Sequence, residues 1–282
     1  MPNNASVEQR LRRVDGRHNS RLKELRRLFR EAAPNEHGEV AVDGMHLVEE
    51  ALRSGLRVSA VFFSDAARQR AHKLLPQLSA HTETLVVPDE LFAAAVPSES
   101  PQGVAAIIKI RPFSLDDLLA IQPALLVVTI GLQDPGNLGT VARSGEAFGA
   151  TGLLLGEGTV SPWNWKAARA SAGSLFRLPS AKLPTAEVLP EIKARGIRVL
   201  ATSSHKGTPV WEVDLCGPSA ILIGGEGAGV PRNLLSLADE LIAIPQSERL
   251  ESLNAGIAAS VVLYEAARQR QNPPQRHRDT EV

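Results

Sequence analysis

The chain has 282 residues, of which 43% are apolar, and its 31 Lys and Arg balance 31 Asp and Glu. This length favours two domains, each with its own core. No apolar run approaches the ~20 residues of a membrane span, and the N-terminus lacks the apolar segment of a secretory signal, so we expect neither a membrane protein nor an exported one. The lone Cys216 excludes an internal disulfide and fits a cytoplasmic protein. The seven histidines have no ligand spacing, so we expect no metal.

Positive charge is concentrated at the N-terminus, because residues 1–30 carry nine Lys and Arg against three Asp and Glu. Such an arm can neutralise RNA phosphates and gain affinity by releasing counterions. The same segment has four apolar residues at helical spacing, which predicts that part of it docks on a core: Leu22, Leu25, Leu28 and Phe29. Two interpretations are therefore open, a basic RNA-binding arm and a docked helix with a solvated basic face.

Residues 31–110 alternate short strand and helix patterns and predict a small α/β domain. "GEVAVD" and "RVSAVFFS" are typical of strands, whereas "MHLVEEALRSG" has one apolar helical face. Residues 111–123 hold two prolines around one short helical segment, and we interpret them as a linker. Residues 271–282 have almost no apolar side chains, so we expect a disordered tail.

Residues 124–270 form the second predicted domain. "ALLVVTIG", "TGLLLG", "GIRVLATS" and "SAILIGG" are apolar runs typical of strands that are buried on both faces of a parallel sheet, and helical segments lie between them. This alternation predicts a mostly parallel sheet with helices on both faces. A ligand is expected outside the carboxyl ends of the strands.

Three glycine-rich or polar clusters follow these strands. They are "DPGNLGTVAR" (134–143), "GGEGAGVP" (224–231) and "IPQSERLESLNAGIAAS" (244–260). The middle cluster lacks both the dinucleotide glycine pattern and the Gly-Lys-Ser/Thr of a phosphate loop. A bare glycine turn would indicate loop geometry alone, but this turn contains Glu226. Because a carboxylate repels phosphate, the cluster predicts a ligand that lacks phosphates.

In order and spacing, these clusters resemble the motifs of the TrmH/SpoU family of RNA ribose 2′-O-methyltransferases, within the SPOUT superfamily. "DPGNLGTVARSGEAFGA", "LIGGEGAGVP" and "IP" followed by "ESLN" carry the resemblance, which covers residues 124–269. Upstream, "VDGMHLVEEAL" and "PQGVAAI" resemble the substrate-binding domain, similar to ribosomal protein L30e, of many members that act on ribosomal RNA. The resemblance implies an α/β fold with a trefoil knot, a homodimer and S-adenosylmethionine as methyl donor. It favours ribosomal RNA as the substrate, with transfer RNA as the alternative.

The resemblance also implies the site residues. Arg143 matches the family's essential arginine, and the other residues of the reaction centre are Asn137, Glu226, Ser252 and Asn254. The cofactor-binding positions are Thr202, Gly225, Ile244 and Leu253. An arginine can hold the phosphate beside the target ribose and stabilise negative charge on the 2′-oxygen. Because a guanidinium stays protonated, we interpret Arg143 as an electrostatic clamp, which Glu226 can hold in a bidentate pair.

Several of these residues have structural alternatives. Asn137 and Ser252 precede helical runs and can cap them. The segment "SPWNWKAARASAGSLFRLP" (161–179) has two tryptophans that we interpret as packing residues. It also has three cations that either bind RNA or lie on a solvated face: Lys166, Arg169 and Arg177.

The third motif departs from the family's pattern. Glu248 stands where a glycine is common, and Ala255 and Gly256 stand in place of a valine-serine pair, which puts the details of cofactor affinity in question. A second class of function also fits the chain, namely an RNA-binding protein with a degenerate pocket that acts in ribosome assembly. The joint presence of all the reaction-centre residues favours the enzyme.

Overall fold

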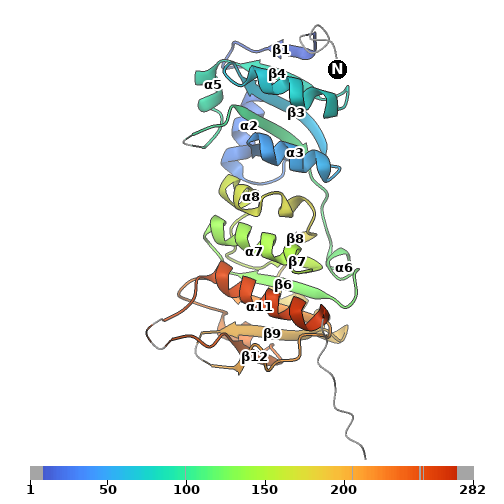
Figure 1. Ribbon diagram of the computed structural model, residues 1–282, viewed down its shortest axis with the longest axis vertical. Coiled ribbons are helices and arrows are strands. Elements are labelled where there is room, and N and C mark those ends of the chain that lie inside the picture. Colours follow the sequence, from blue (N-terminus) through green and yellow to red (C-terminus); the bar gives the residue numbers. More distant parts are fainter. Residues whose placement is uncertain (1–8, 99, 205, 248, 250, 272–282) are drawn as a thin grey trace, which may run out of the picture. The chain divides into compact units, whose positions relative to one another are not determined.

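The computed structural model describes residues 9–98, 100–204, 206–247, 249 and 251–271 (Figure 1). The chain divides into two compact units. Unit 1 comprises residues 1–112 and 161–177, and unit 2 comprises residues 113–160 and 178–282. Apart from its first residue, the predicted tail lies outside the described residues. In the described part of the chain, no helix combines the length and the apolar character that a membrane crossing requires.

Unit 1 contains a five-stranded mixed sheet in the order β1-β4-β3-β5-β2. Its strands are β1 (Leu11–Arg13), β2 (Glu39–Asp43), β3 (Arg57–Ser64), β4 (Glu83–Val87) and β5 (Val104–Lys109). Strands β1, β4 and β3 run parallel, whereas β5 is antiparallel to both β3 and β2. Its helices are α2 (Ser20–Glu31), α3 (Met45–Arg53), α4 (Ala71–Leu74), α5 (Asp89–Ala93) and α8 (Trp165–Ser171).

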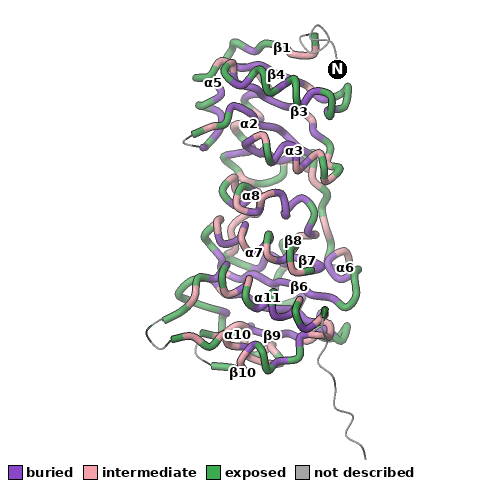
Figure 2. Tube along the Cα trace, in the orientation of Figure 1, coloured by how far each residue is buried: buried purple, intermediate pink, exposed green. Residues whose placement is uncertain are grey.

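The strands of this sheet are largely buried (Figure 2). Alternation along them builds a core on each face of the sheet. Val61 and Phe63 of β3 pack with α3, whereas Ala60 and Phe62 pack with α2 and α5 on the other face. Successive side chains of a strand point to opposite faces, so a run such as "AVFF" supplies both cores at once. The predicted strands and the apolar face of α3 are therefore confirmed.

The N-terminal arm is part of this sheet. Strand β1 pairs with the edge of β4, and the four apolar residues of α2 are buried, as their spacing predicts. Several arm cations form ion pairs within unit 1: Arg12 with Glu83, Arg13 with Asp65, and Arg21 with Glu83. Removing residues 1–30 would therefore remove an edge strand and a core helix, and not only positive charge.

Unit 2 contains a seven-stranded sheet in the order β10-β12-β9-β11-β6-β7-β8. Its strands are β6 (Leu125–Ile130), β7 (Gly152–Leu155), β8 (Ser180–Lys182), β9 (Arg198–Ser203), β10 (Thr208–Pro209), β11 (Ser219–Gly224) and β12 (Glu240–Ala243). Every pairing between these strands is parallel. The predicted parallel sheet is confirmed, and the trefoil knot stays a prediction.

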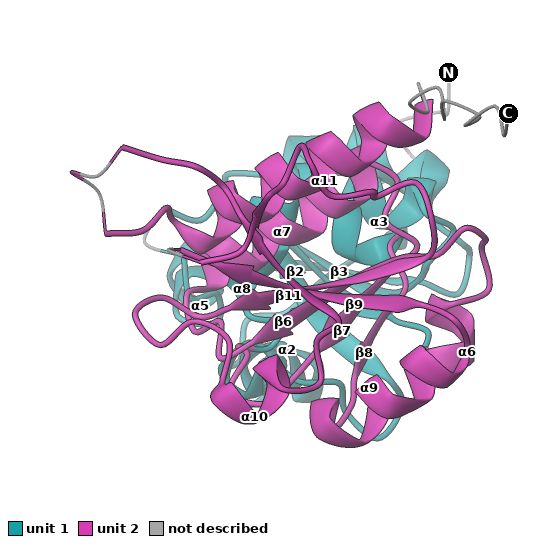
Figure 3. Cartoon of the chain, turned by 90° about the horizontal axis from the view of Figure 1, so that it is seen from below, with its two compact units in different colours: residues 1–112, 161–177 teal, residues 113–160, 178–282 magenta. Residues whose placement is uncertain are grey.

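Helices cover both faces of this sheet (Figure 3). Helices α7 (Pro135–Ala147) and α11 (Ala255–Gln271) lie on one side, and α6 (Leu115–Leu118), α9 (Thr185–Ala194) and α10 (Arg232–Leu235) lie on the other. Leu115 and Leu118 of α6 are buried in the core beneath α9, so part of the predicted linker packs as core of unit 2.

Residues 161–177 follow β7 and precede β8 in the sequence, yet they group with unit 1. Ala168 and Phe176 from this segment join the core that contains α3. The predicted domain limits, with residues 124–270 as one catalytic domain, stay predictions. By compactness alone, the chain leaves unit 2 at Val160 and returns at Leu178.

The last turn of α11 is attached to unit 2 through Arg270. Its guanidinium donates to the carbonyl oxygens of Leu215 at 3.0 Å, Pro123 at 2.9 Å, Ala124 at 3.0 Å and Gly217 at 2.8 Å. Burial lowers the pKa of this guanidinium. One side chain thus joins four backbone carbonyl groups from two segments of unit 2, residues 123–124 and 215–217, to the end of α11.

We expect Arg270→Ala to lower the free energy of unfolding by about 3 kcal/mol, because four hydrogen bonds from a charged guanidinium are lost. Urea unfolding followed by circular dichroism measures this loss. Arg268→Ala is the matched control, since Arg268 lies in the same turn, has a side chain that is 49% exposed and pairs with Glu265 of its own helix. Equal losses in the two variants would contradict the proposed attachment.

Candidate active site

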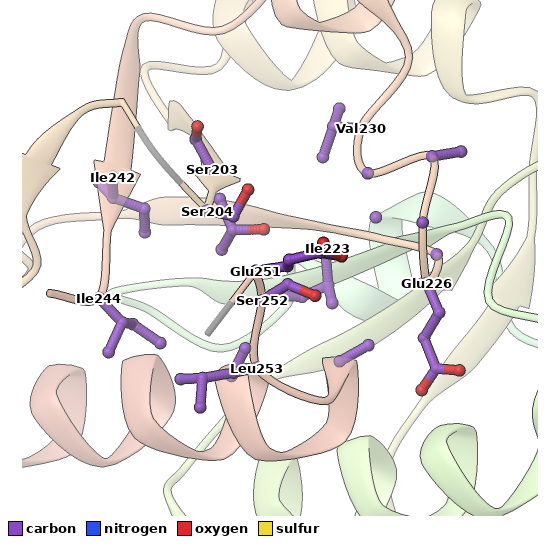
Figure 4. Close-up of a pocket in the computed structure, with 18 of the residues that line it drawn as sticks. Ser203, Ser204, Ile223, Glu226, Val230, Ile242, Ile244, Glu251, Ser252 and Leu253 are labelled. Atoms are coloured by element: carbon purple, nitrogen blue, oxygen red, sulfur yellow. The ribbon is translucent and has the colours of Figure 1, made fainter. Parts of the chain in front are cut away.

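A pocket of about 600 Å³ lies at the carboxyl ends of β9, β11 and β12 (Figure 4). Thr202 comes from the end of β9, Ile223 and Gly225 from the end of β11, and Ile244 from the residues after β12. The segment that leads into α11 closes the pocket with Ser252 and Leu253. This is the edge of a parallel sheet at which ligands are expected to bind.

The lining of the pocket combines apolar and polar side chains in similar measure. Ile223, Val230, Ile242, Ile244 and Leu253 supply the apolar surface. The described lining residues include two carboxylates, Glu226 and Glu251, but no Lys, Arg or His. Such a pocket is unsuited to a phosphate and suits a neutral or cationic organic ligand, as the glycine cluster predicted. Among the described residues, no group of His, Cys, Asp and Glu is arranged to hold a metal ion.

The glycine loop after β11 requires glycine at two positions. A Cβ on Gly225 would lie 2.1 Å from the carbonyl oxygen of Gly131. A Cβ on Gly224 would lie 2.1 Å from the carbonyl carbon of Gly229. The backbone NH of Gly229 donates to the carbonyl oxygen of Gly225 at 3.0 Å, which closes the loop. The glycines therefore permit close backbone packing at the wall of the pocket.

Glu226 joins the three motifs. The Nδ2 of Asn137 donates to Oε1 of Glu226 at 2.5 Å, and the Nδ2 of Asn254 donates to the same oxygen at 3.1 Å. Asn137 is buried on α7, Glu226 lies on the glycine loop, and Asn254 precedes α11. Three residues from three separated motifs thus share one carboxylate oxygen.

The helix caps differ from the predicted alternatives. Asp134 caps α7 by accepting from the backbone NH of Asn137 at 2.8 Å. Asn254 caps α11, because its Oδ1 accepts from the NH groups of Gly256 at 3.0 Å and Ile257 at 3.2 Å. Capping by Asn137 or Ser252 is therefore wrong. Asn254 combines a cap through its oxygen with the contact to Glu226 through its nitrogen.

Helices α7 and α11 approach closely beside this cluster. The hydroxyl groups of Ser144 and Ser260 lie 2.6 Å apart, and a Cβ on Gly256 would lie 3.1 Å from Cβ of Thr140. The departure from the family's pattern at Gly256 thus coincides with a tight helix contact, and Ala255 lines the pocket. The other departure, Glu248, lies outside the described residues.

Arg143 is exposed on α7, and its predicted pairing with Glu226 is not formed in the described part of the chain. The reason is helical geometry, because six residues separate Arg143 from Asn137 and rotate it by about 240° around the helix axis. Thr202, Gly225, Glu226, Ile244, Ser252 and Leu253 all line the pocket. The structure thus brings every predicted site residue except Arg143 into the pocket or into contact with Glu226.

Sequence reasoning missed four polar residues of the lining: Ser203, Ser204, Gln246 and Glu251. The signal was present, since two directly follow Thr202, one follows Ile244 and one precedes Ser252. Thr202 itself donates to the carbonyl oxygen of Leu222 at 2.9 Å, so its hydroxyl also ties β9 to β11.

Two family models match the chain. Residues 124–264 match the SpoU rRNA Methylase family, and residues 19–106 match the MRM3-like substrate binding domain. A 23S rRNA (guanosine(2553)-2'-O)-methyltransferase, RlmP of Bacillus subtilis, is 30% identical over 254 residues, which are 90% of this chain and 98% of that protein. A 23S rRNA (uridine(2479)-2'-O)-methyltransferase of Streptomyces viridochromogenes is 32% identical over 83% of this chain and 84% of that protein.

Solved structures agree with these matches. The SpoU methyltransferase AviRb from Streptomyces viridochromogenes, in complex with AdoMet (S-adenosylmethionine), has a TM-score of 0.80 and 30% identity, covering 90% of this chain and 99% of that one. An AdoMet-bound rRNA methyltransferase from Sinorhizobium meliloti has a TM-score of 0.80 and 29% identity, covering 92% of this chain and 98% of that one. The fold and the site define an RNA methyltransferase. The chain belongs to the SpoU rRNA Methylase family, which confirms the predicted resemblance.

We expect Glu226→Ala to lower the free energy of unfolding by about 1 to 2 kcal/mol, because the buried amide of Asn137 loses its acceptor. Thermal unfolding measures the change. Glu251→Ala removes a second carboxylate from the same pocket and should leave stability close to wild type. A Glu226→Ala variant as stable as Glu251→Ala would contradict the importance of the shared carboxylate.

Proposed function

We propose that this protein transfers the methyl group of S-adenosylmethionine to a ribose 2′-hydroxyl of ribosomal RNA. The observation that carries the proposal is the position of the Asn137–Glu226–Asn254 cluster at the wall of the pocket. A pocket large enough for the cofactor therefore lies next to a group of polar side chains that hydrogen bonds hold in place. Cytoplasmic location, where ribosomal RNA is found, is part of the same proposal.

The pocket fits the chemistry of S-adenosylmethionine. About 600 Å³ lies within the usual range for small-molecule sites, and the described lining has carboxylates without cations, which suits a sulfonium. Ile244 and Leu253 would contact the adenine, and Thr202 and the backbone of Gly225 would hold polar groups. When bound, S-adenosylmethionine supplies an electrophilic methyl carbon. The residues of the chain then have to place the ribose oxygen in line with it.

Arg143 would hold the RNA phosphate beside the target ribose and stabilise the charge that grows on the 2′-oxygen. Its guanidinium stays protonated, so the proton of the hydroxyl leaves to phosphate or water. The hydrogen bonds from Asn137 and Asn254 to Glu226 hold the glycine loop against α7 and the start of α11. Ser252 adds a hydroxyl at the pocket. Positioning of this kind can supply several kcal/mol of the barrier.

Ribosomal RNA is favoured over transfer RNA for two reasons. Residues 19–106 match a substrate-binding domain model, and two relatives that span most of the chain act on 23S rRNA. Unit 1, with its own two cores, can hold a structured RNA independently of the catalytic sheet.

Transfer of labelled methyl from S-adenosylmethionine to ribosomal and transfer RNA tests this proposal. We expect label on a ribosomal ribose, and we expect Arg143→Ala to lower kcat by about 10²- to 10³-fold while cofactor affinity stays unchanged. Arg195→Ala, a surface arginine paired with Asp116 and Glu191, is the control.

Label on transfer RNA alone would overturn the substrate. Absence of S-adenosylmethionine binding in calorimetry would overturn the enzyme and favour an RNA-binding protein with a degenerate pocket.

The proposal includes a homodimer formed through α11. Ile257, Val261 and Tyr264 are exposed at 53%, 36% and 56%, and their spacing places them on one stripe of the helix. The ring of Tyr264 contacts Phe148 edge-on, which extends the apolar surface. A second copy covers this stripe. Because α7 packs against α11 through Ser144 and Ser260, the second copy would then lie beside α7, the helix that carries Arg143.

We expect wild type to sediment as a dimer and Val261→Asp to sediment as a monomer, because a buried unpaired carboxylate opposes association. Ile121→Asp is the matched control, since Ile121 is 63% exposed but lies outside α11. A monomeric wild type at micromolar concentration would refute the dimer.

A further inference from the structure

The segment 161–177 presents two cations on one aromatic ring. Nζ of Lys166 lies 5.5 Å from the ring centroid of Trp165, and Cζ of Arg169 lies 5.8 Å from it. Trp165 is half-buried against the core that contains α2, whereas both cations are exposed. Because Lys166 and Arg169 are three residues apart on α8, they lie on the same side and repel each other. An anion placed between them would relieve this repulsion.

The segment that carries this pair is firmly attached to unit 1. Trp163 stacks on Phe176 with the ring centroids 6.5 Å apart. Arg177 donates to Oε2 of Glu50 at 2.7 Å, so it has a structural partner. A Cβ on Gly173, which has φ +93°, would lie 2.7 Å from Cβ of Glu50. The two predicted packing tryptophans therefore differ, since Trp163 packs and Trp165 also carries the cations.

Arg169 is held in place from beneath. Its Nη1 donates to Oγ of Ser98 at 3.1 Å and lies 4.0 Å from Oδ2 of Asp43. The Asp43 side chain is only 2% exposed, and its Oδ1 has no hydrogen-bond partner among the described residues, which is a costly arrangement for a carboxylate. Burial raises the pKa of Asp43 to about 6. The Arg169 side chain is 43% exposed, so a ligand can reach it from solvent.

Two exposed cations on another part of unit 1, by contrast, have carboxylate partners. Lys73 binds Glu49 at 2.8 Å, and Arg53 binds Glu50. Among the described residues, Lys166 has no carboxylate partner. The carboxylate partner of Arg169 is the buried Asp43, whose Oδ2 lies 4.0 Å from Nη1, the distance limit of an ion pair. Lys166 and Arg169 are therefore held on one ring while their positive charge is only partly neutralised.

We propose that Lys166 and Arg169, supported by Trp165, bind a backbone phosphate of the RNA substrate, and that Ser98 and Asp43 position Arg169. This inference rests on the proposed function for its choice of ligand, since RNA is the polyanion that this family modifies. Because residues 160 and 178 connect the segment directly to β7 and β8, the phosphate site is covalently continuous with the catalytic sheet.

The test compares the double variant Lys166→Gln/Arg169→Gln with wild type in filter binding of ribosomal RNA and polyuridylate across a salt titration. Loss of this phosphate contact should raise the dissociation constant roughly tenfold and reduce the slope of log K against log salt by about 0.7 to 0.9. The matched control Arg53→Gln/Lys73→Gln removes the same charge from paired positions, and it should keep the wild-type slope.

Ser98→Ala tests the positioning role. It should weaken RNA binding by roughly two- to threefold without changing the salt slope, because Arg169 keeps its charge. A smaller slope would show that the cation itself has been displaced and would refute a positioning role.

Polyuridylate separates this inference from the proposed function. If wild type binds polyuridylate but methylates no RNA, the function fails while the phosphate site is still tested. If the double variant and the control bind polyuridylate and ribosomal RNA with equal affinity and slope, the phosphate site is refuted whether or not methyl transfer occurs.

Discussion

One oxygen of the Glu226 carboxylate accepts hydrogen bonds from two amides that lie 89 and 28 residues away in the sequence. The rest of the site depends on this contact. It fixes the glycine loop against the start of α7 and against the residue that caps α11, so three motifs behave as one structural unit. Because Asn254 also caps α11, the helix with the exposed apolar stripe starts at the hydrogen-bond cluster around Glu226. A hydrogen bond therefore links the loop that lines the cofactor pocket to the helix that carries the proposed dimer surface.

Charge is divided between the two units according to their tasks. The described lining of the pocket in unit 2 has no cation, which suits a sulfonium cofactor. In unit 1 three cations of the arm, Arg12, Arg13 and Arg21, pair with Glu83 or Asp65, so part of the positive charge of the arm is neutralised within the unit. The cations on Trp165 differ because an indole, unlike a carboxylate, attracts a cation without cancelling its charge.

Much of the fold could be predicted from the sequence, because long apolar strands and glycine turns are local signals. The strands β6, β7, β9 and β11 and the pocket at their ends follow from such patterns. Strands β1 and β10 are three and two residues long and show no readable period. The sharing of Glu226 by two asparagines and the rotation of Arg143 away from it depend on tertiary geometry. The grouping of residues 161–177 with unit 1 depends on which core accepts Phe176, and periodicity contains no information about that.

Unit 1 is discontinuous in sequence, since it needs both residues before 112 and the stretch 161–177. A gene fusion that exchanged only the N-terminal portion between relatives would leave Trp163 and Phe176 facing a foreign core. The N-terminal portion and residues 161–177 therefore have to change together during evolution. When the RNA target changes, we expect substitutions both in residues 1–112 and in residues 161–177, rather than changes confined to the N-terminal half.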